Sequence, residues 1–293
     1  MNGFPRYVDL ECTARCNLKC GFCFGPADDR TVSDLDYTFW RKVLVAIARR
    51  GCVGITVSGG EPTLYPELGN LLSYAKELGM QTVLSTHGRH EKRLLSVVDS
   101  CDWVALPVDV ATPEALHLMR GGAWGLSEAT ALAERLKLHT NNRVRIKLGT
   151  VATRINQAEI VGLAERLNDL PNMPFDIWKI YQYTPRRKYA ESRSIYEINT
   201  GAFHALASDV RATGVCNQIS TVFSSHDLRR RAYLFVYPDG TLAIPNEGKD
   251  FSDIVVGNLT TEGDAAFDRI QHYDLTSNCD NFEMTYAQCS SSP

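Results

Sequence analysis

The chain has 293 residues, of which 44% are hydrophobic and 22% charged, and its formal net charge is −3. This size and composition are typical of a globular protein with one large core, or one core and a small appendage. The charge argues against binding to a nucleic-acid polymer, and no apolar run approaches the roughly 20 residues of a membrane span. The first residues lack the apolar segment of a secretory signal. The nine cysteines therefore predict reduced thiols or metal ligands in a cytoplasmic protein, not disulfides.

Apolar runs alternate with segments of helical periodicity up to about residue 183. The predicted strands are residues 7–11, 53–57, 81–84, 103–108, 143–151 and 175–181. The predicted helices are residues 39–47, 66–78, 90–98, a short one from 112, 126–138 and 160–167. Strand–helix steps with near-continuous apolar strands predict a parallel α/β sheet. Because a complete eight-unit barrel takes around 250 residues, we expect a partial (β/α)6 barrel of the TIM type.

The sequence beginning at Thr184-Pro185 interrupts this alternation. We therefore predict a core barrel in residues 1–185 and a small α+β region in residues 186–293. The second region contains a predicted helix at 201–212 and a hairpin of strands 233–237 and 241–244, joined by Pro238-Asp239-Gly240. Two basic runs, at 186–188 and 229–231, are interpreted as solvated surfaces, with capture of an anionic substrate as the alternative.

Three cysteines follow the first predicted strand at the spacing C-x3-C-x2-C, namely Cys16, Cys20 and Cys23. Thiolates select zinc, copper(I) or iron–sulfur clusters. A structural zinc site uses four protein ligands, whereas three ligands leave one coordination position open. A [4Fe-4S] cluster held by three thiolates has one iron free to bind a small molecule. The alternative is a zinc-binding module in which Cys12 adds the fourth thiolate.

A second motif, Gly59-Gly60-Glu61, follows the second predicted strand. Glycines allow close approach to the backbone, and both motifs lie at carboxyl ends of strands, where such sheets carry their reactive groups. With Phe22 before the last cysteine, the two motifs resemble those of the radical S-adenosylmethionine (SAM) superfamily.

This resemblance implies one [4Fe-4S] cluster on Cys16, Cys20 and Cys23, with SAM bound at the open iron. Reductive cleavage of SAM then gives a 5′-deoxyadenosyl radical that abstracts a hydrogen atom from substrate, with electrons from a flavodoxin- or ferredoxin-type donor. The implied SAM contacts are Phe22 beside the cluster, Gly59, Gly60 and Glu61 at the methionine amine, Ser85 and Thr86 near the ribose, and Arg120 at the carboxylate.

Several stretches also resemble the viperin group, which converts CTP to a 3′-deoxy-3′,4′-didehydro nucleotide. These stretches are the cluster loop through Phe24, the sequences around Lys147 and Lys179, and the C-terminal segment 233–257. The resemblance implies that Lys147 and Lys179 bind substrate phosphates, that Gln182 and Tyr237 also contact the substrate, and that residues 186–293 cover it. For the two lysines, a structural ion pair is the alternative.

The sequence departs from the viperin pattern at several positions. Gly54 stands in place of a phosphate-binding lysine, Ile177 in place of an arginine and Gly149 in place of an asparagine, while His87 replaces an asparagine common in the superfamily. Because phosphate binding is largely charge pairing, a nucleoside monophosphate, a nucleoside or a sugar suits the remaining cations better than CTP. The expected reaction is dehydration, epimerisation or rearrangement of a nucleotide or nucleoside sugar.

The C-terminal hairpin also resembles the auxiliary twitch/SPASM region of peptide- and sugar-modifying radical SAM enzymes. Asn246 stands where that region has a cysteine, so we expect no second cluster. An aminosugar epimerase and a peptide maturase are the alternative enzymes. For an epimerase, Cys216, Cys279 or Cys289 is a candidate hydrogen donor.

Overall fold

The computed structural model describes residues 4–25, 32–120, 122, 124–186, 193–229, 232–245 and 253–275. Asn246, Cys279 and Cys289, about which the sequence raised expectations, lie outside these ranges. The same holds for four members of the basic runs, Arg187, Lys188, Arg230 and Arg231.

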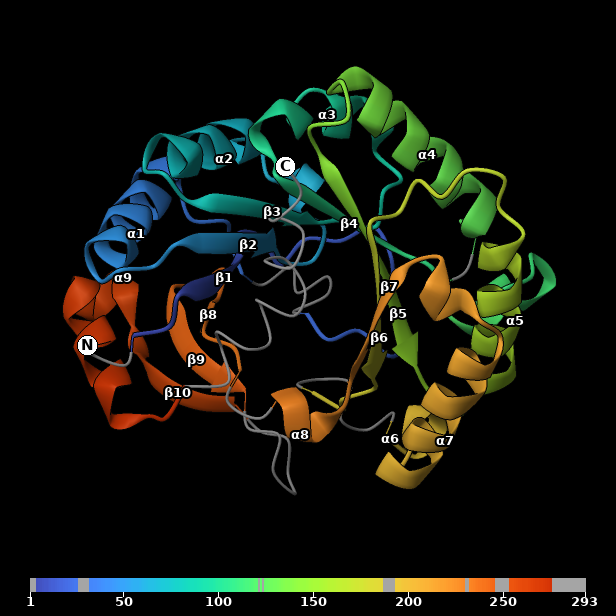
Figure 1. Cartoon of the computed structure of the whole chain (residues 1–293). Helices are drawn as coiled ribbons and strands as arrows, with labels where there is room; N and C mark the ends of the chain where they lie inside the picture. Colours follow the sequence, from blue (N-terminus) through green and yellow to red (C-terminus); the bar gives the residue numbers. More distant parts are fainter. Residues whose placement is uncertain are drawn as a thin grey trace.

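One curved sheet runs through the described part of the chain, with the order β10-β9-β8-β1-β2-β3-β4-β5-β6-β7 (Figure 1). The parallel strands are β1 (Tyr7–Glu11), β2 (Gly54–Ser58), β3 (Gln81–Ser85), β4 (Trp103–Pro107), β5 (Arg145–Ala152), β6 (Ile177–Gln182) and β7 (Ser220–Ser224). Strand β8 (Phe235–Val236) pairs in parallel with β1, and β9 (Thr241–Pro245) and β10 (Asp253–Asn258) follow antiparallel. The predicted α/β partial barrel is confirmed, and β7 is a further parallel strand that the sequence pattern does not predict.

Helices line the outer side of this sheet (Figure 1). They are α1 (Tyr37–Arg49), α2 (Leu68–Glu77), α3 (Glu91–Leu95), α4 (Leu126–His139), α5 (Gln157–Asn168) and α7 (Thr200–Ala212). Shorter helices are α6 (Arg193–Tyr196), α8 (His226–Arg229) and α9 (Leu259–Glu262). The carboxylate of Asp36 caps α1 by accepting from the backbone N–H of Phe39 at 2.8 Å. The predicted helix at 90–98 is shorter, because α3 ends at Leu95 and a separate 3₁₀ turn covers Val98–Ser100.

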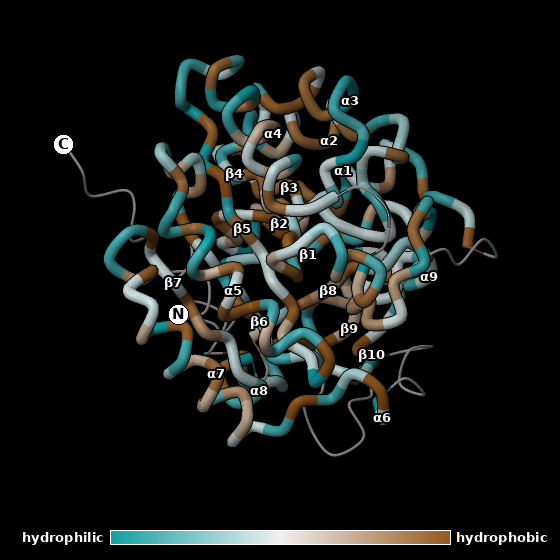
Figure 2. The backbone as a smooth tube through the Cα atoms, turned by 90° about the vertical axis from the view of Figure 1, so that its right-hand side faces the viewer, coloured by the Kyte–Doolittle hydropathy of each residue, from teal (hydrophilic) through white to brown (hydrophobic). Residues whose placement is uncertain are grey.

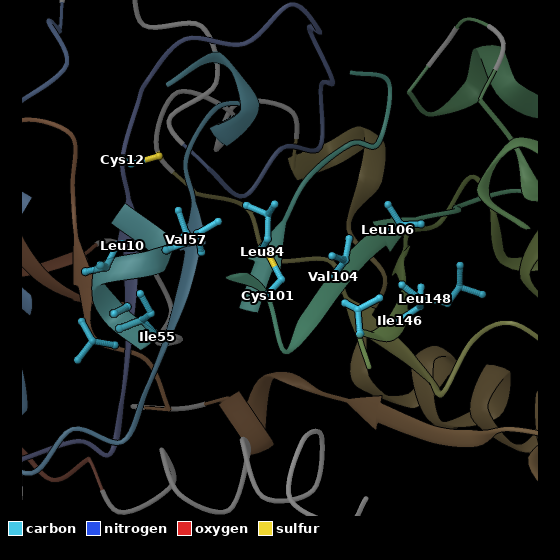
Figure 3. Packing of buried hydrophobic residues seen from close by; sticks show 14 of the residues in the cluster. Leu10, Cys12, Ile55, Val57, Leu84, Cys101, Val104, Leu106, Ile146 and Leu148 are labelled. Carbon is cyan, nitrogen blue, oxygen red and sulfur yellow. The ribbon is translucent and has the colours of Figure 1, made fainter. Parts of the chain in front are cut away.

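The core lies between the sheet and these helices. Leu10, Ile55, Leu84, Val104 and Ile146 are fully buried in one cluster, and Figure 3 shows them beside one another on neighbouring strands. Hydrophobic stretches accordingly follow the central strands in Figure 2, whereas many loops and helix ends are polar. Burial against the helices accounts for the apolar character of the strands in sequence.

The inner face of the sheet is apolar at the amino ends of the strands and polar further along. At the amino ends, Tyr7, Val83, Trp103 and Ile177 form a small apolar cluster. Because side chains alternate between the two faces of a strand, residues two positions further along share this inner face, and several of these are charged. The apolar cluster thus closes the bottom of the barrel, below a polar interior.

Arg186 connects the C-terminal strands to the cysteine loop. It is 1% exposed, and its guanidinium carbon lies 4.0 Å from the ring centre of Phe24 and 5.2 Å from that of Phe235. Its Nη2 also lies 2.5 Å from Oδ1 of Asp253. The expectation that the first basic run is a solvated surface is therefore wrong for Arg186, since an ion pair and two aromatic rings enclose it. In the described part of the chain, no helix is long and apolar enough to cross a bilayer.

Candidate active site

A cavity of about 300 Å³ occupies the polar interior of the barrel. Nearly all the site residues predicted from sequence line it: Cys16, Cys20, Phe22, Cys23, Gly59, Gly60, Glu61, Ser85, Thr86, Arg120, Lys147, Lys179 and Gln182. Tyr237 is not among the lining residues. Its hydroxyl donates to Oδ2 of Asp253 at 2.5 Å and accepts from Arg186 at 2.8 Å.

The three cysteines of the loop after β1 meet at one end of the cavity as free thiols. Burial raises the pKa of Cys16, and burial together with the neighbouring Cys20 raises the pKa of Cys23 to about 11. A metal centre displaces such protons when it binds. Cys12 is buried beneath the loop instead, where its Sγ donates to the carbonyl of Ser58 at 3.4 Å. Three soft donors on one wall therefore fit a [4Fe-4S] cluster with one open iron.

The Gly59-Gly60 pair packs directly on the backbone of the cysteine loop. The N–H of Gly60 donates to the carbonyl of Thr13 at 2.7 Å, and the N–H of Glu61 donates to that of Arg15 at 2.7 Å. A Cβ on Gly60 would lie 2.3 Å from the Arg15 oxygen, and Gly59 has a φ of +142°. Glycine is thus required here by the chain's own packing, which fixes this motif against the cysteine loop.

The carboxylate of Glu61 is 1% exposed and held from several directions. Its Oε1 accepts from the hydroxyls of Thr63 and Thr86, both at 2.6 Å, and from the N–H of Thr63 at 3.1 Å. Its Oε2 accepts from the N–H of His87 at 2.8 Å. Oε2 therefore accepts one hydrogen bond against three contacts on Oε1, and its second lone pair can accept from a further donor such as an ammonium group.

Two histidines join Glu61 to the cysteine loop. Burial lowers the pKa of His87 to about 4, so its ring is neutral near pH 7. Its Nδ1 accepts from the N–H of Arg89 at 3.0 Å, so the proton lies on Nε2, which donates to Oδ1 of Asn17 at 2.7 Å. Nδ1 of His90 lies 2.7 Å from the hydroxyl of Thr63. Sequence reasoning noted His87 only as a departure from the family pattern, and missed Asn17 and His90.

Arg120 is held by a partner that sequence reasoning missed, Asp109, which follows β4. Nε of Arg120 lies 2.6 Å from Oδ2 of Asp109, and the guanidinium carbon lies 5.1 Å from the ring centre of Phe22. Burial alone would lower the pKa of Arg120, but Asp109 and the thiols of Cys20 and Cys23 raise it overall. The side chain is therefore a fixed cation beside the cysteines.

The other end of the cavity combines acidic and basic groups. Nζ of Lys147 donates to the hydroxyl of Tyr181 at 3.1 Å, and Nζ of Lys179 lies 5.2 Å from the centre of the same ring. Burial lowers the pKa of Lys179, as do Lys147 and Arg229 to a smaller extent. Two acidic side chains of β1, Asp9 and Glu11, also line the cavity. Sequence reasoning missed both of them.

The interpretation of the second basic run as a solvated surface is wrong for Arg229. It is 3% exposed and lines the cavity. Its Nη2 donates to the carbonyl of Gln182 and to the hydroxyl of Thr184, both at 2.6 Å. The side-chain amide of Gln182 is itself engaged, since it donates to the carbonyl of Ile198 at 3.0 Å and accepts from the N–H of His226 at 3.0 Å. Cys216, in contrast, is exposed and does not line the cavity.

The family profile of the radical SAM superfamily matches residues 10–167. The chain belongs to the radical SAM superfamily. Members of this superfamily use a [4Fe-4S] cluster and SAM, in agreement with the three thiols and the Gly-Gly-Glu motif at one end of the cavity. The zinc-module alternative is thereby set aside.

Similar proteins within the superfamily include peptide cyclases and nucleotide dehydratases. The PqqA peptide cyclase of Bradyrhizobium diazoefficiens is 40% identical over 85 residues, which cover 29% of this chain and 22% of the relative. The S-adenosylmethionine-dependent nucleotide dehydratase of Flammeovirga pacifica is 28% identical over 61% of this chain and 63% of its own. The chain thus spans less than two thirds of the length of either relative. The nucleotide dehydratase of Selenomonas ruminantium is 26% identical over 96% of this chain and 97% of its own.

Solved structures agree in fold. The crystal structure of Streptococcus suis SuiB bound to S-adenosylmethionine has a TM-score of 0.65 at 17% identity, covering 82% of this chain and 60% of SuiB. At this identity the likeness concerns the fold alone.

Proposed function

We propose that this radical SAM enzyme abstracts a hydrogen atom from a small polar substrate, a nucleotide or a nucleoside sugar. When bound and reduced, the cluster with SAM supplies a 5′-deoxyadenosyl radical. The observation that carries the proposal is one cavity lined by two groups of residues. The thiols, Glu61 and Arg120 lie in loops beyond the carboxyl ends of strands, whereas Lys147 and Lys179 lie within β5 and β6. The two lysines favour an anionic substrate. Dehydration, epimerisation or rearrangement follows hydrogen abstraction, with a flavodoxin- or ferredoxin-type protein as electron donor.

The charge of the lower cavity, the part lined by Asp9, Glu11, Lys147, Lys179 and Arg229, favours one phosphate over three. A triphosphate carries about four negative charges and needs several cations. Here Asp9 and Glu11 offset part of the positive charge of Lys147, Lys179 and Arg229, and burial lowers the pKa of Lys179. A side chain at Gly54 would also collide with Tyr7, because a Cβ there would lie 2.5 Å from the Tyr7 ring. We therefore favour a nucleoside monophosphate or a sugar phosphate over CTP.

Two alternatives follow from the relatives and from the superfamily. The 40% identity to a PqqA peptide cyclase supports a peptide maturase, but it covers only 29% of this chain. A match that covers 96% of this chain is to a nucleotide dehydratase. An aminosugar epimerase is compatible with the acidic groups of the lower cavity.

The test is formation of 5′-deoxyadenosine by anaerobically reconstituted protein with SAM and dithionite. The panel contains nucleosides, nucleoside mono-, di- and triphosphates, sugar phosphates and aminosugars. We expect at least one phosphorylated nucleoside or sugar to raise the rate about tenfold or more over SAM alone, and Cys20→Ala to abolish the product. Absence of stimulation by every member of the panel would overturn the proposed substrate class.

A further inference from the structure

Asp9 is a buried acid on the wall of the lower cavity with an unused acceptor. It lies on β1, is 6% exposed and lines the cavity. The side chain of Thr56 on the neighbouring strand lowers the pKa of this carboxyl group, against the larger effect of burial. Its second carboxylate oxygen, Oδ2, has no hydrogen-bond partner among the residues that the structure describes. An unsatisfied buried acceptor costs stability, and such groups in native proteins call for a functional explanation.

The surroundings of Asp9 argue against a purely structural ion pair. Lys147 on β5 and Lys179 on β6 are close enough for their charges to lower its pKa. Within the described ranges, however, Oδ2 of Asp9 bonds to neither ammonium group. Asp9, Lys147 and Lys179 thus line the same cavity, while the buried Oδ2 of Asp9 bonds to neither lysine.

We propose that Asp9 binds a hydroxyl or amino group of the substrate next to an anionic group held by Lys147 and Lys179. This inference rests on the function proposed above and deepens it. The substrate class it names is a phosphorylated molecule with a hydrogen-bond donor near the phosphate, such as the sugar of a nucleoside monophosphate or an amino sugar phosphate.

The protonation of Asp9 suits either donor. Burial raises its pKa to about 7, although Thr56 and Lys147 lower it in part. Near pH 7 the carboxyl group is therefore partly ionised, and the ionised form can bind an ammonium group. A hydroxyl can bond to either protonation state. The titratable groups that face Asp9 are Glu11 on its own strand, Cys52 before β2, Lys147 on β5, and Lys179 and Tyr181 on β6.

The experiment is calorimetric titration of the reconstituted, SAM-loaded enzyme without reductant. One arm compares cytidine 5′-monophosphate with its 2′-deoxy and 3′-deoxy analogues. The other compares glucosamine 6-phosphate and glucose 6-phosphate with 2-deoxyglucose 6-phosphate. In at least one arm we expect the hydroxyl- or amino-bearing ligand to bind roughly 10- to 100-fold more tightly than its deoxy partner, as for hydrogen bonds to a charged group. The arm that discriminates identifies the donor.

Asp9→Leu keeps the branched shape of the side chain and removes the acceptor. We expect it to reduce the preference to within about twofold, whereas Glu11→Gln, which removes the same charge from the same cavity, retains the preference.

Because folding raises the pKa of Asp9 from 3.8 to about 7, the folded state loses stability as pH rises through this window. Asp9→Leu and Asp9→Asn should therefore raise the Tm more at pH 8 than at pH 5, which also verifies that both variants fold.

The titrations distinguish failure of the role of Asp9 from failure of the proposed function. Equal binding of the deoxy ligands by the wild type, or an undiminished preference in Asp9→Leu, overturns the role of Asp9 and leaves the proposed substrate class in place. Failure of every phosphorylated ligand to bind overturns the proposed function itself, and this inference with it.

Discussion

At the scale of single residues, the cavity depends on partners that lie outside the recognisable motifs. Asp109 holds Arg120 through a contact of 2.6 Å and also accepts from the N–H of Val151 at 2.8 Å. The cation that we expect to meet SAM is therefore positioned by the strand end after β4 and by β5 together.

Replacing Asp109 with asparagine should weaken SAM binding by about tenfold, which corresponds to about 1.4 kcal/mol. The change removes the ionic partner of Arg120 but leaves the three thiols in place. Equilibrium dialysis with labelled SAM measures the affinity, and the visible absorption of the cluster verifies that the thiols still assemble it. The matched control is Asp99→Asn, which removes an exposed ion pair with Arg143. Unchanged SAM affinity in Asp109→Asn would show that Arg120 does not need this partner.

Motif residues could be predicted because they are neighbours in sequence, whereas Asp9, Asp109 and Arg229 could not be assigned without the fold. Their roles depend on which side of a strand or loop faces the cavity. Asp9 did leave a signal, since an acid between the fully buried Val8 and Leu10 is unusual in an apolar strand. Arg229 left none, because a basic run in sequence is usually solvated.

At the scale of elements, the buried strands could be predicted from the sequence, and the short or partly exposed strands could not. The predicted strands β1 to β6 have apolar residues that pack against helices, so they stand out in sequence. Strand β7 has the sequence STVFS, lies at an edge of the sheet and is only partly buried, while β8 has two residues. Such short or partly exposed strands are defined by their neighbours and give no periodic pattern of their own.

The contact of Arg186 with Asp253 should determine how firmly β9 and β10 are held. Asp253→Asn removes the charge that pairs with a buried guanidinium, and breaking a buried pair costs about 3–5 kcal/mol. We expect amide hydrogen exchange in β9 and β10 to accelerate at least tenfold, with little change in β2 to β4. Asp268→Asn, which removes an exposed partner of Arg50 in the same region, is the control. A uniform acceleration across the sheet would instead indicate global destabilisation.

At the scale of the whole molecule, the sheet brings distant segments to one rim. The cysteine loop follows β1, Gly59-Gly60-Glu61 follows β2, His87 follows β3 and Asp109 follows β4. Strands from the C-terminal region extend the same sheet at both edges, because β7 pairs with β6 and β8 with β1. We propose that residues 186–293 act as the substrate-covering region of a core formed by residues 1–185.

We propose that the three thiols and the Gly-Gly-Glu motif form one site for an open-iron cluster and SAM. Electron paramagnetic resonance of the reduced, reconstituted protein tests this most directly. We expect a [4Fe-4S]⁺ signal whose g-values shift when SAM is added, and loss of this signal in Cys20→Ala. A cluster signal that SAM leaves unchanged, or a protein that binds zinc and no iron, would contradict it.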